Sequence, residues 1–201
     1  NWNGTQWVQQ GADIDGEAGG DSSGSSISLS SDGNTIAIGA PDNDGNGSNS
    51  GHVRIYNWNG TQWVQQGVDI DGETAGDNSG ASVSLSSDGS NVAIGADFND
   101  GNGSNSGHVR IYNWNGTAWI QKGIDIDGED TWDNSGGSVS LSSDGNYVAI
   151  GAGRNGSLSG HVRIYNWNGS QWIQQGVDID GEASGDRSGQ SVSLSSDGNI
   201  V

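Results

Sequence analysis

Hydrophobic and polar residues alternate one by one at the start of a segment that recurs along the chain. Residues 26–30, Ser-Ile-Ser-Leu-Ser, follow a two-residue period, which is typical of a strand with one face against a core. Residues 31–34, Ser-Asp-Gly-Asn, have the composition of a turn, and residues 35–40, Thr-Ile-Ala-Ile-Gly-Ala, form a second apolar run. The pattern therefore predicts two antiparallel strands joined by a tight turn.

A longer polar loop separates this pair from two more predicted strands. The third strand covers roughly residues 52–57 and the fourth residues 61–66. Between them, Asn59-Gly60 predicts a type I′ hairpin turn, because both central residues of that turn need positive φ, which Asn and Gly tolerate. Residues 67–80 then lead to the next first strand.

The whole pattern repeats. The tetrapeptide Asn-Trp-Asn-Gly begins at residues 1, 57, 113 and 166, which gives periods of 56, 56 and 53 residues. Residues 1–56 and 57–112 are identical at 45 positions, so the copies should share one conformation. Four strands in a repeat of this length are typical of a propeller blade. We therefore predict an all-β fold, a β-propeller whose four-stranded blades are about 56 residues long, with small residues near the axis and Tyr and Trp farther out.

The predicted organisation is one propeller segment, residues 1–201. It comprises the end of one blade with a linker (1–25), three blades (26–80, 81–136 and 137–190) and the start of another blade (191–201). We expect a segment of a larger ring, because an open propeller leaves strand edges that pair indiscriminately. The alternative is a ring completed by a second copy.

Composition narrows the possible partners. The formal net charge is −19, with only six basic residues, which argues against nucleic acid or an anionic membrane as a partner. The chain has no Cys and no apolar run near 18 residues, so neither disulfides nor membrane insertion are predicted. Eight of the nine Trp recur at the hairpin positions, and such regularly spaced aromatic residues favour a packed β structure despite 37 Gly.

Three short motifs give the chain a family resemblance. Residues 23–28, 37–41 and 51–56 resemble the Phe-Gly-x-Ser-Val, Gly-Ala-Pro and Gly-x-Val-x-Val-Tyr segments of the FG-GAP repeat family, found in integrin alpha subunits and in bacterial or algal surface proteins. The family Phe is Ser here, Pro survives only at Pro41, and the family calcium loop is replaced by Ser-Asp-Gly-Asn. The resemblance implies an extracellular propeller, seven-bladed or similar, used for adhesion or recognition.

One carboxylate-rich loop in each repeat is a candidate metal site. Clustered carboxylates in a turn-rich loop suit Ca²⁺, which prefers oxygen ligands, so Ca²⁺ is the candidate cofactor. In the other interpretation, the carboxylates cap turns between blades by accepting backbone N–H groups. The candidates are Asp13, Asp15, Glu17 and Asp21; Asp69, Asp71, Glu73 and Asp77; Asp125, Asp127, Glu129 and Asp133; and Asp178, Asp180, Glu182 and Asp186.

A second candidate calcium loop begins at Asp42. Asp42, Asp44 and Asn46 fit the first half of an Asp-x-Asp-x-Asn-Gly loop, but Val53 stands where the twelfth-position Glu is needed. Later copies lose the pattern, so we expect a flexible, solvated loop.

Each repeat also carries one His in the sequence Gly-His-Val-Arg-Ile-Tyr. His52, His108 and His161 occupy equivalent positions, which lie apart in a ring, so we do not expect them to share a metal. We predict that they pack beside the neighbouring Arg.

The hairpin offers two further kinds of site. Its first Trp, at Trp2, Trp58, Trp114 and Trp167, is a candidate for stacking on sugar rings, or it packs between blades. Asn3, Asn59, Asn115 and Asn168 begin Asn-Gly-Ser/Thr sequons that are candidate glycosylation sites, although Asn-Gly is also turn chemistry.

No catalytic constellation is recognisable. An active site needs different residues converging at one place, whereas nearly every polar residue here repeats with the period. We therefore expect a non-enzyme, a secreted or cell-surface propeller with an adhesion, structural or protein-interaction role. The alternative is a calcium-dependent or lectin-like protein with one weak site per blade. The expected partner is a protein or glycan at a surface.

Overall fold

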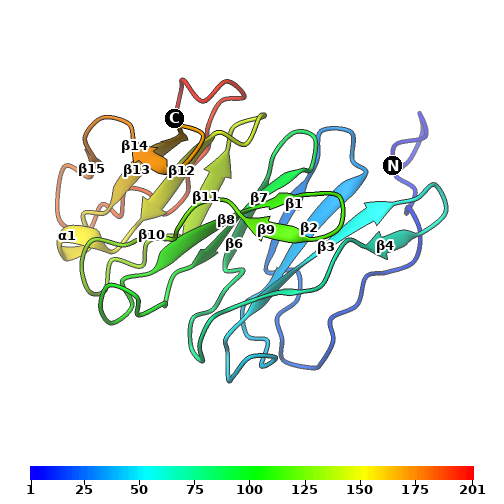
Figure 1. The fold of residues 1–201 in the computed structure, drawn as a ribbon, viewed down its shortest axis with the longest axis horizontal. Coiled ribbons are helices and arrows are strands. Elements are labelled where there is room, and N and C mark those ends of the chain that lie inside the picture. Colours follow the sequence, from blue (N-terminus) through cyan, green and yellow to red (C-terminus); the bar gives the residue numbers. More distant parts are fainter.

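The computed structural model describes residues 1–201 as three antiparallel β-sheets that stand side by side in chain order (Figure 1). The first sheet contains β1 (Ser26–Leu29), β2 (Thr35–Ala40), β3 (His52–Trp58), β4 (Trp63–Gln65) and β5 (Ile70–Asp71). The second contains β6 (Ser82–Leu85), β7 (Asn91–Ala96), β8 (His108–Trp114), β9 (Trp119–Gln121) and β10 (Ile126–Asp127). The third contains β11 (Ser138–Leu141), β12 (Tyr147–Ala152), β13 (His161–Trp167), β14 (Trp172–Gln174) and β15 (Ile179–Asp180).

Each sheet has the same topology. In the first, β1, β2 and β3 pair in sequence, and β3 pairs along its outer edge with both β4 and β5. The fourth strand predicted at residues 61–66 is therefore broken: Trp63 pairs with Trp58, the chain leaves the sheet at Gly67, and Ile70 returns to pair with Val53. Gly67 has φ +85°, a left-handed conformation that ends a strand and that glycine adopts without steric cost.

The three sheets are propeller blades, as predicted. Their innermost strands β1, β6 and β11 contact one another in turn, and serine makes this approach possible. The Ser28 hydroxyl accepts the Leu85 backbone N–H at 2.9 Å, and the Ser26 hydroxyl donates to the Gly80 carbonyl oxygen at 2.7 Å. Small polar side chains on the inner strands thus link adjacent blades directly.

The prediction of a type I′ hairpin turn was wrong. Only Gly60 has positive φ (+97°), and four residues separate β3 from β4. The Asn59 side-chain oxygen accepts the backbone N–H groups of Thr61 and Gln62 at 2.9 and 3.0 Å. Asn59 therefore shapes the turn through its side chain, as Asx turns do, and needs no left-handed backbone.

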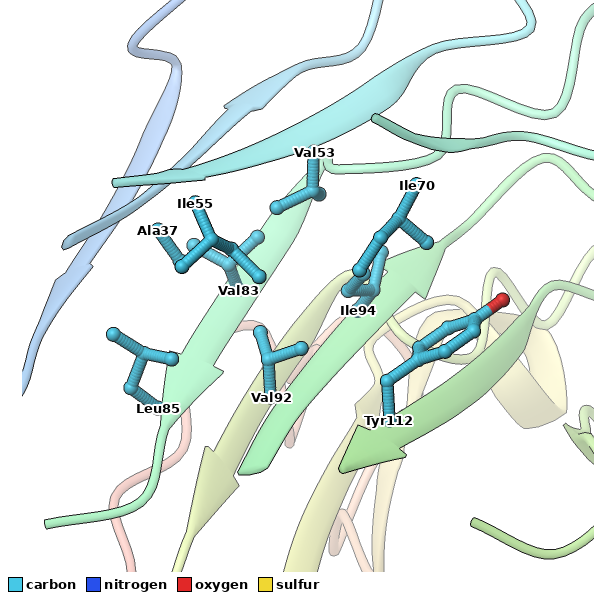
Figure 2. Packing of buried hydrophobic residues seen from close by; sticks show 9 residues of the cluster. All are labelled: Ala37, Val53, Ile55, Ile70, Val83, Leu85, Val92, Ile94 and Tyr112. Carbon is cyan, nitrogen blue, oxygen red and sulfur yellow. The ribbon is translucent and has the colours of Figure 1, made fainter. Parts of the chain in front are cut away.

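Apolar side chains of neighbouring blades fill the space between the sheets (Figure 2). The first core joins Ala37, Val53, Ile55 and Ile70 of the first blade to Val83, Leu85, Val92, Ile94 and Tyr112 of the second. An equivalent core lies between the second and third blades. A blade packs one set of apolar residues against the preceding blade and a different set against the following blade. The same interface is therefore repeated along the row.

The two outer faces of the row have no partner sheet. Leu29 on the first blade is 56% exposed, whereas its equivalent Leu85 is 7% exposed. At the other end, Ile179 is exposed while its equivalents Ile70 and Ile126 are buried. The exposed face of the first blade is therefore equivalent to the face that the second blade packs against the first. The exposed face of the third blade is equivalent to the face that the first and second blades each pack against the next blade.

A short turn distinguishes the third blade. The element α1 (Asn155–Leu158) replaces part of the polar loop, and both Gly156 and Ser157 have positive φ, so it is not a regular α-helix. No helix in the structure has the length and apolar character needed to cross a membrane.

Candidate functional sites at the blade interfaces

Two tryptophans face each other across every hairpin. Trp114 and Trp119 lie at the paired ends of β8 and β9, with ring centroids 5.4 Å apart. The Trp119 indole N–H donates to the Gln66 carbonyl oxygen of the preceding blade at 2.8 Å. A Cβ on Gly67 would lie 3.0 Å from both rings, so glycine is required for this approach. The structure thus places Trp58, Trp114 and Trp167 in interblade contacts, half-buried, and leaves Trp2 exposed.

A groove runs beside this tryptophan at two equivalent places. The groove beside Trp114 has a volume of about 610 Å³, and the one beside Trp58 about 500 Å³. The first is lined by Asn57, Asn59, Val64, Gln65, Gln66 and Gly67 with Trp114; the second by Asn1, Asn3, Val8, Gln9, Gln10 and Gly11 with Trp58. One aromatic wall with several amides is the combination that orients a small polar ligand.

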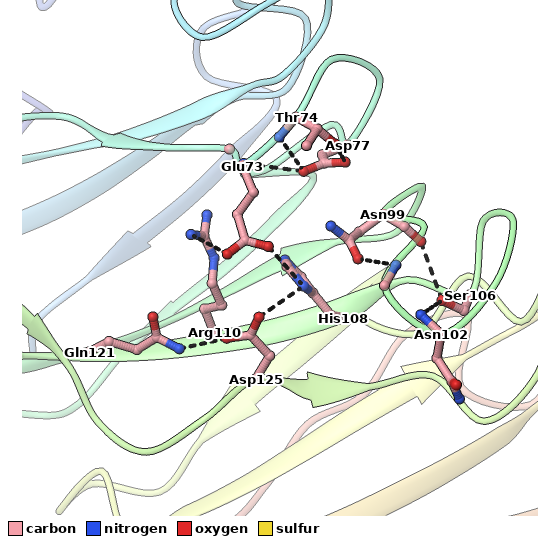
Figure 3. A network of polar contacts seen from close by, with 12 residues as sticks. Glu73, Thr74, Asp77, Asn99, Asn102, Ser106, His108, Arg110, Gln121 and Asp125 are labelled. Carbon is pink, nitrogen blue, oxygen red and sulfur yellow. Dashed lines mark hydrogen bonds and ion pairs between the residues drawn. The ribbon is translucent and has the colours of Figure 1, made fainter.

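A second repeated feature joins a buried imidazole to two carboxylates (Figure 3). Glu73 follows β5 of the first blade, whereas His108 begins β8 and Asp125 precedes β10 of the second. The Nδ1 atom of His108 lies 3.9 Å from Glu73 Oε2 and 3.7 Å from Asp125 Oδ2. The same cluster forms at the other copies, as Glu17, His52 and Asp69 and as Glu129, His161 and Asp178.

Neighbouring side chains hold the two carboxylates of this cluster. Arg110 Nη1 lies 3.7 Å from Glu73 Oε1, and Arg110 Nη2 donates to the Asp71 carbonyl oxygen at 2.7 Å. Gln121 donates its side-chain N–H to Asp125 Oδ1. The Arg therefore ties the loop of one blade to the strand of the next, and it orients the Glu toward the imidazole.

Burial decides the charge of the imidazole. His108 is only 1% exposed, and this burial, with the Arg110 charge adding to it, lowers the pKa of His108 to about 4. Burial also raises the pKa of Glu73, against the opposing effect of Arg110. Near pH 7 the imidazole is therefore neutral, because burial disfavours its charged form.

The four carboxylates predicted to act together in each loop are distributed over different contacts. In the second set, Asp77 caps its own turn, where its carboxylate accepts the Thr74 N–H at 2.9 Å and the Thr74 hydroxyl at 2.8 Å. The Asp71 carbonyl oxygen binds Arg110. Glu73 contacts the His of the following blade, and Asp69 contacts His52 of its own blade. The loop thus serves two adjacent clusters.

The sequence prediction did not include His as a member of this cluster. Each of the three His lies in a cluster of its own, as expected for equivalent positions in separate blades. The signal that could have indicated the cluster is the constant 17-residue spacing between each His and the following Asp, as in His52 and Asp69 or His108 and Asp125.

The loop at Asp42 is more firmly anchored than the predicted solvated loop. Asn46 donates its amide N–H to the Gly72 carbonyl oxygen at 2.8 Å, and Asp44 accepts the Asn49 N–H at 2.8 Å. Asp42 accepts the Ser22 hydroxyl, and Asn43 is buried. The side chains proposed as calcium ligands are thus engaged in hydrogen bonds within the protein.

The sequon asparagines are exposed, and their side-chain oxygens accept hydrogen bonds within the hairpin turns. Asn115 accepts the Thr117 N–H, and Asn168 accepts the Ser170 N–H, each at 2.9 Å. Asn3 and Asn59 form the same contact with Thr5 and Thr61. Glycosylation of these residues stays a prediction.

One pocket breaks the repetition. It has a volume of about 300 Å³ between the second and third blades, and Asp97, Asn134, Arg154 and Arg187 are among its lining residues. Burial raises the pKa of Asp97, with Arg154 opposing the shift. Arg154 and Arg187 have no equivalent Arg in the other repeats, and no pattern in the sequence indicates that they share a pocket.

Comparison with known proteins supports the fold and one repeat. Residues 12–56 match the family model of the FG-GAP repeat, as the resemblance predicted. No curated protein matches the chain.

The chain aligns with parts of several solved structures. Hydrazine synthase from Kuenenia stuttgartiensis aligns with a TM-score of 0.54 at 15% identity, over 96% of this chain and 44% of that one. TolB from Acinetobacter baumannii aligns with a TM-score of 0.48 at 15% identity, over 86% and 35%. The β-propeller domain of the trilobed protease from Pyrococcus furiosus aligns with a TM-score of 0.44 at 11% identity, over 77% and 41%. The chain thus spans less than half the length of these structures.

Proposed function

We propose that this chain is a non-catalytic β-propeller module at an extracellular surface, where it serves an adhesion, structural or protein-interaction role. The FG-GAP repeat match at residues 12–56 supports the extracellular placement. The observation that carries the proposal is repetition: the groove beside Trp58 recurs beside Trp114, and the His–carboxylate cluster recurs at three copies. Equivalent sites on a rigid scaffold favour multivalent binding, in which weak sites add through avidity.

The same repetition argues against catalysis. An active site requires a nucleophile or base, an orienting group and a stabilising donor at one place, whereas each interface of this chain repeats one small set of groups. If turnover of any substrate were lost on changing a single non-repeated residue, such as Arg154→Ala, the non-catalytic role would be refuted.

A lectin-like role is the second candidate, and the grooves are the observation that favours it. Each combines part of a tryptophan ring with amide side chains of Asn and Gln. Aromatic rings stack on the apolar faces of sugars, and amides donate to and accept from hydroxyl groups. Such a site would bind neutral sugars weakly, once per interface.

A glycan array separates the two roles. The purified chain is immobilised at increasing density and presented to glycans, to a panel of extracellular proteins and to cell surfaces, each with and without EDTA. Protein or cell binding that rises steeply with density and resists free sugars supports the interaction role. Glycan binding inhibited by free sugar supports the lectin role. If no surface is bound at any density, neither role holds.

A matched pair of substitutions tests the groove itself. Gln66→Ala removes a groove side chain, whereas Gln62→Ala removes an exposed side chain of the same hairpin outside the groove. Under the lectin role, Gln66→Ala combined with Gln10→Ala at the equivalent groove reduces glycan binding, whereas Gln62→Ala does not. An equal reduction of glycan binding by Gln62→Ala would contradict that role.

A further inference from the structure

The geometry points to a site for a divalent transition-metal ion in each Glu–His–Asp cluster, three per chain, with Zn²⁺ as the tested case. This proposal is independent of the surface role proposed above. It differs from a calcium loop, because its ligands come from two blades and include an imidazole.

The buried histidine is aimed at the site. Its side chain is 2% exposed in all three copies, and Nδ1 lies 3.6–3.9 Å from one oxygen of each carboxylate. These separations exceed hydrogen-bond distance, so Nδ1 has two acceptors nearby and is bonded to neither. The three ligand atoms lie within 4.8 Å of one another. Tetrahedral ligands about 2.1 Å from a zinc ion stand about 3.4 Å apart, so small side-chain adjustments bring all three into range.

The chemistry of the three ligand atoms selects the class of ion. Imidazole nitrogen suits Zn²⁺, Cu²⁺ and Ni²⁺, whereas Ca²⁺ takes six to eight oxygen ligands. Three protein ligands leave one tetrahedral position for water, and the exposed carboxylate of Glu73 with the half-buried carboxylate of Asp125 leaves the cluster open to solvent.

The charges around the cluster favour a cation despite the nearby Arg. Two carboxylates and one guanidinium give each cluster a formal charge of about −1, and the whole chain carries −19. The Arg approaches Oε1 of the Glu, whereas the His faces Oε2. The Arg therefore orients the Glu carboxylate through Oε1 and leaves Oε2 free to bind the metal, as residues outside the ligand shell commonly do.

The chain contains its own controls. Glu182 occupies the same loop position as Glu73 but no His follows it in the chain, and Asp13 is the equivalent of Asp69 without a preceding His. Both therefore retain the local sequence of a ligand and lack the cluster.

The experiment measures zinc stoichiometry. Untagged protein is stripped with EDTA, dialysed against Zn²⁺ and assayed for bound metal, with Co²⁺ absorption as the spectroscopic readout of coordination. We expect three Zn²⁺ per chain for the unchanged protein and for Glu182→Gln, two for His108→Gln, and none for the triple variant His52→Gln, His108→Gln, His161→Gln. Far-UV circular dichroism checks that each variant is folded.

Should His108→Gln fail to fold, Glu73→Gln and Asp125→Asn test the same site through side chains that are less buried than His108, and each should lower zinc binding by one equivalent. The proposal is overturned if the unchanged protein binds no zinc, or if a folded variant of a cluster ligand, His108→Gln, Glu73→Gln or Asp125→Asn, retains three equivalents. It is also overturned if Ca²⁺ competes for the same equivalents at equal concentration, because that result would indicate oxygen ligands alone.

Discussion

The Trp119 indole N–H donates to the Gln66 carbonyl oxygen across the first blade interface at 2.8 Å. The same bond joins Trp63 to Gln10 and Trp172 to Lys122. One indole group per blade thus fixes the outer edge of each blade to its predecessor.

Replacing this Trp should weaken the interface. Trp119→Phe keeps an aromatic ring but loses the hydrogen bond and leaves a carbonyl oxygen unpaired, so we expect the free energy of unfolding to fall by about 1–3 kcal/mol. Trp7→Phe is the matched control, because Trp7 is 78% exposed at the first hairpin. Urea unfolding monitored by circular dichroism measures both; equal losses would show that the interblade bond contributes nothing.

Glycine on the second strand should be indispensable where adjacent blades meet. A Cβ on Gly95 would lie 1.9 Å from the Gly136 carbonyl oxygen, so Gly95→Ala must displace the linker before the third blade. Overpacking of this kind costs about 1–3 kcal/mol, occasionally more. Gly19→Ala, where no atom lies within 4 Å, should leave the melting temperature unchanged. If Gly95→Ala melts at the temperature of the unchanged protein, the close approach does not exist in solution.

Two equivalent leucines should differ in their contribution to stability. Leu85 is buried in the first core, whereas its equivalent Leu29 faces no partner sheet. Leu85→Ala should cost about 2–5 kcal/mol in chemical unfolding, and Leu29→Ala much less. A large loss for Leu29→Ala in this chain would show that its face is covered in solution.

Acid stability should depend on the Ser-Asp-Gly turns. The Ser30 hydroxyl, followed by the N–H groups of Asn34, lowers the pKa of Asp32, and the same turn near the C-terminus holds the pKa of Asp197 at about 2. Because the folded-state pKa is below the unfolded value of about 3.9, this stabilisation is complete above pH 3.9. It is lost as the pH falls through the folded-state pKa.

Unfolding measured between pH 5 and pH 2 tests this dependence. Asp32→Asn should flatten the decline in stability over that interval, and an NMR titration should place the carboxyl of Asp32 below its usual pKa. A titration at the usual value would contradict the hydrogen-bonding role of the turn.

Much of the fold could be predicted because its signals are local. The second strand, Thr35–Ala40, has the bounds expected from its apolar run, and the first and third differ by one residue at one end. The break between β4 and β5 was not predictable in the same way. It depends on the close approach of Gly67 to Trp114 and Trp119 of the next blade. No sequence pattern within one repeat predicts that contact.

The sequence by itself determined the repeat, the strand order, the glycine-rich turns and the acidic character, because strand alternation and turn chemistry act between residues close along the chain. Only the tertiary structure decided which side chains meet at the blade interfaces. Glu73 reaches His108 and Arg110 because adjacent sheets pack face to face in one register, and packing of many apolar contacts, rather than any short motif, sets that register. The candidate metal sites lie at these interfaces for the same reason.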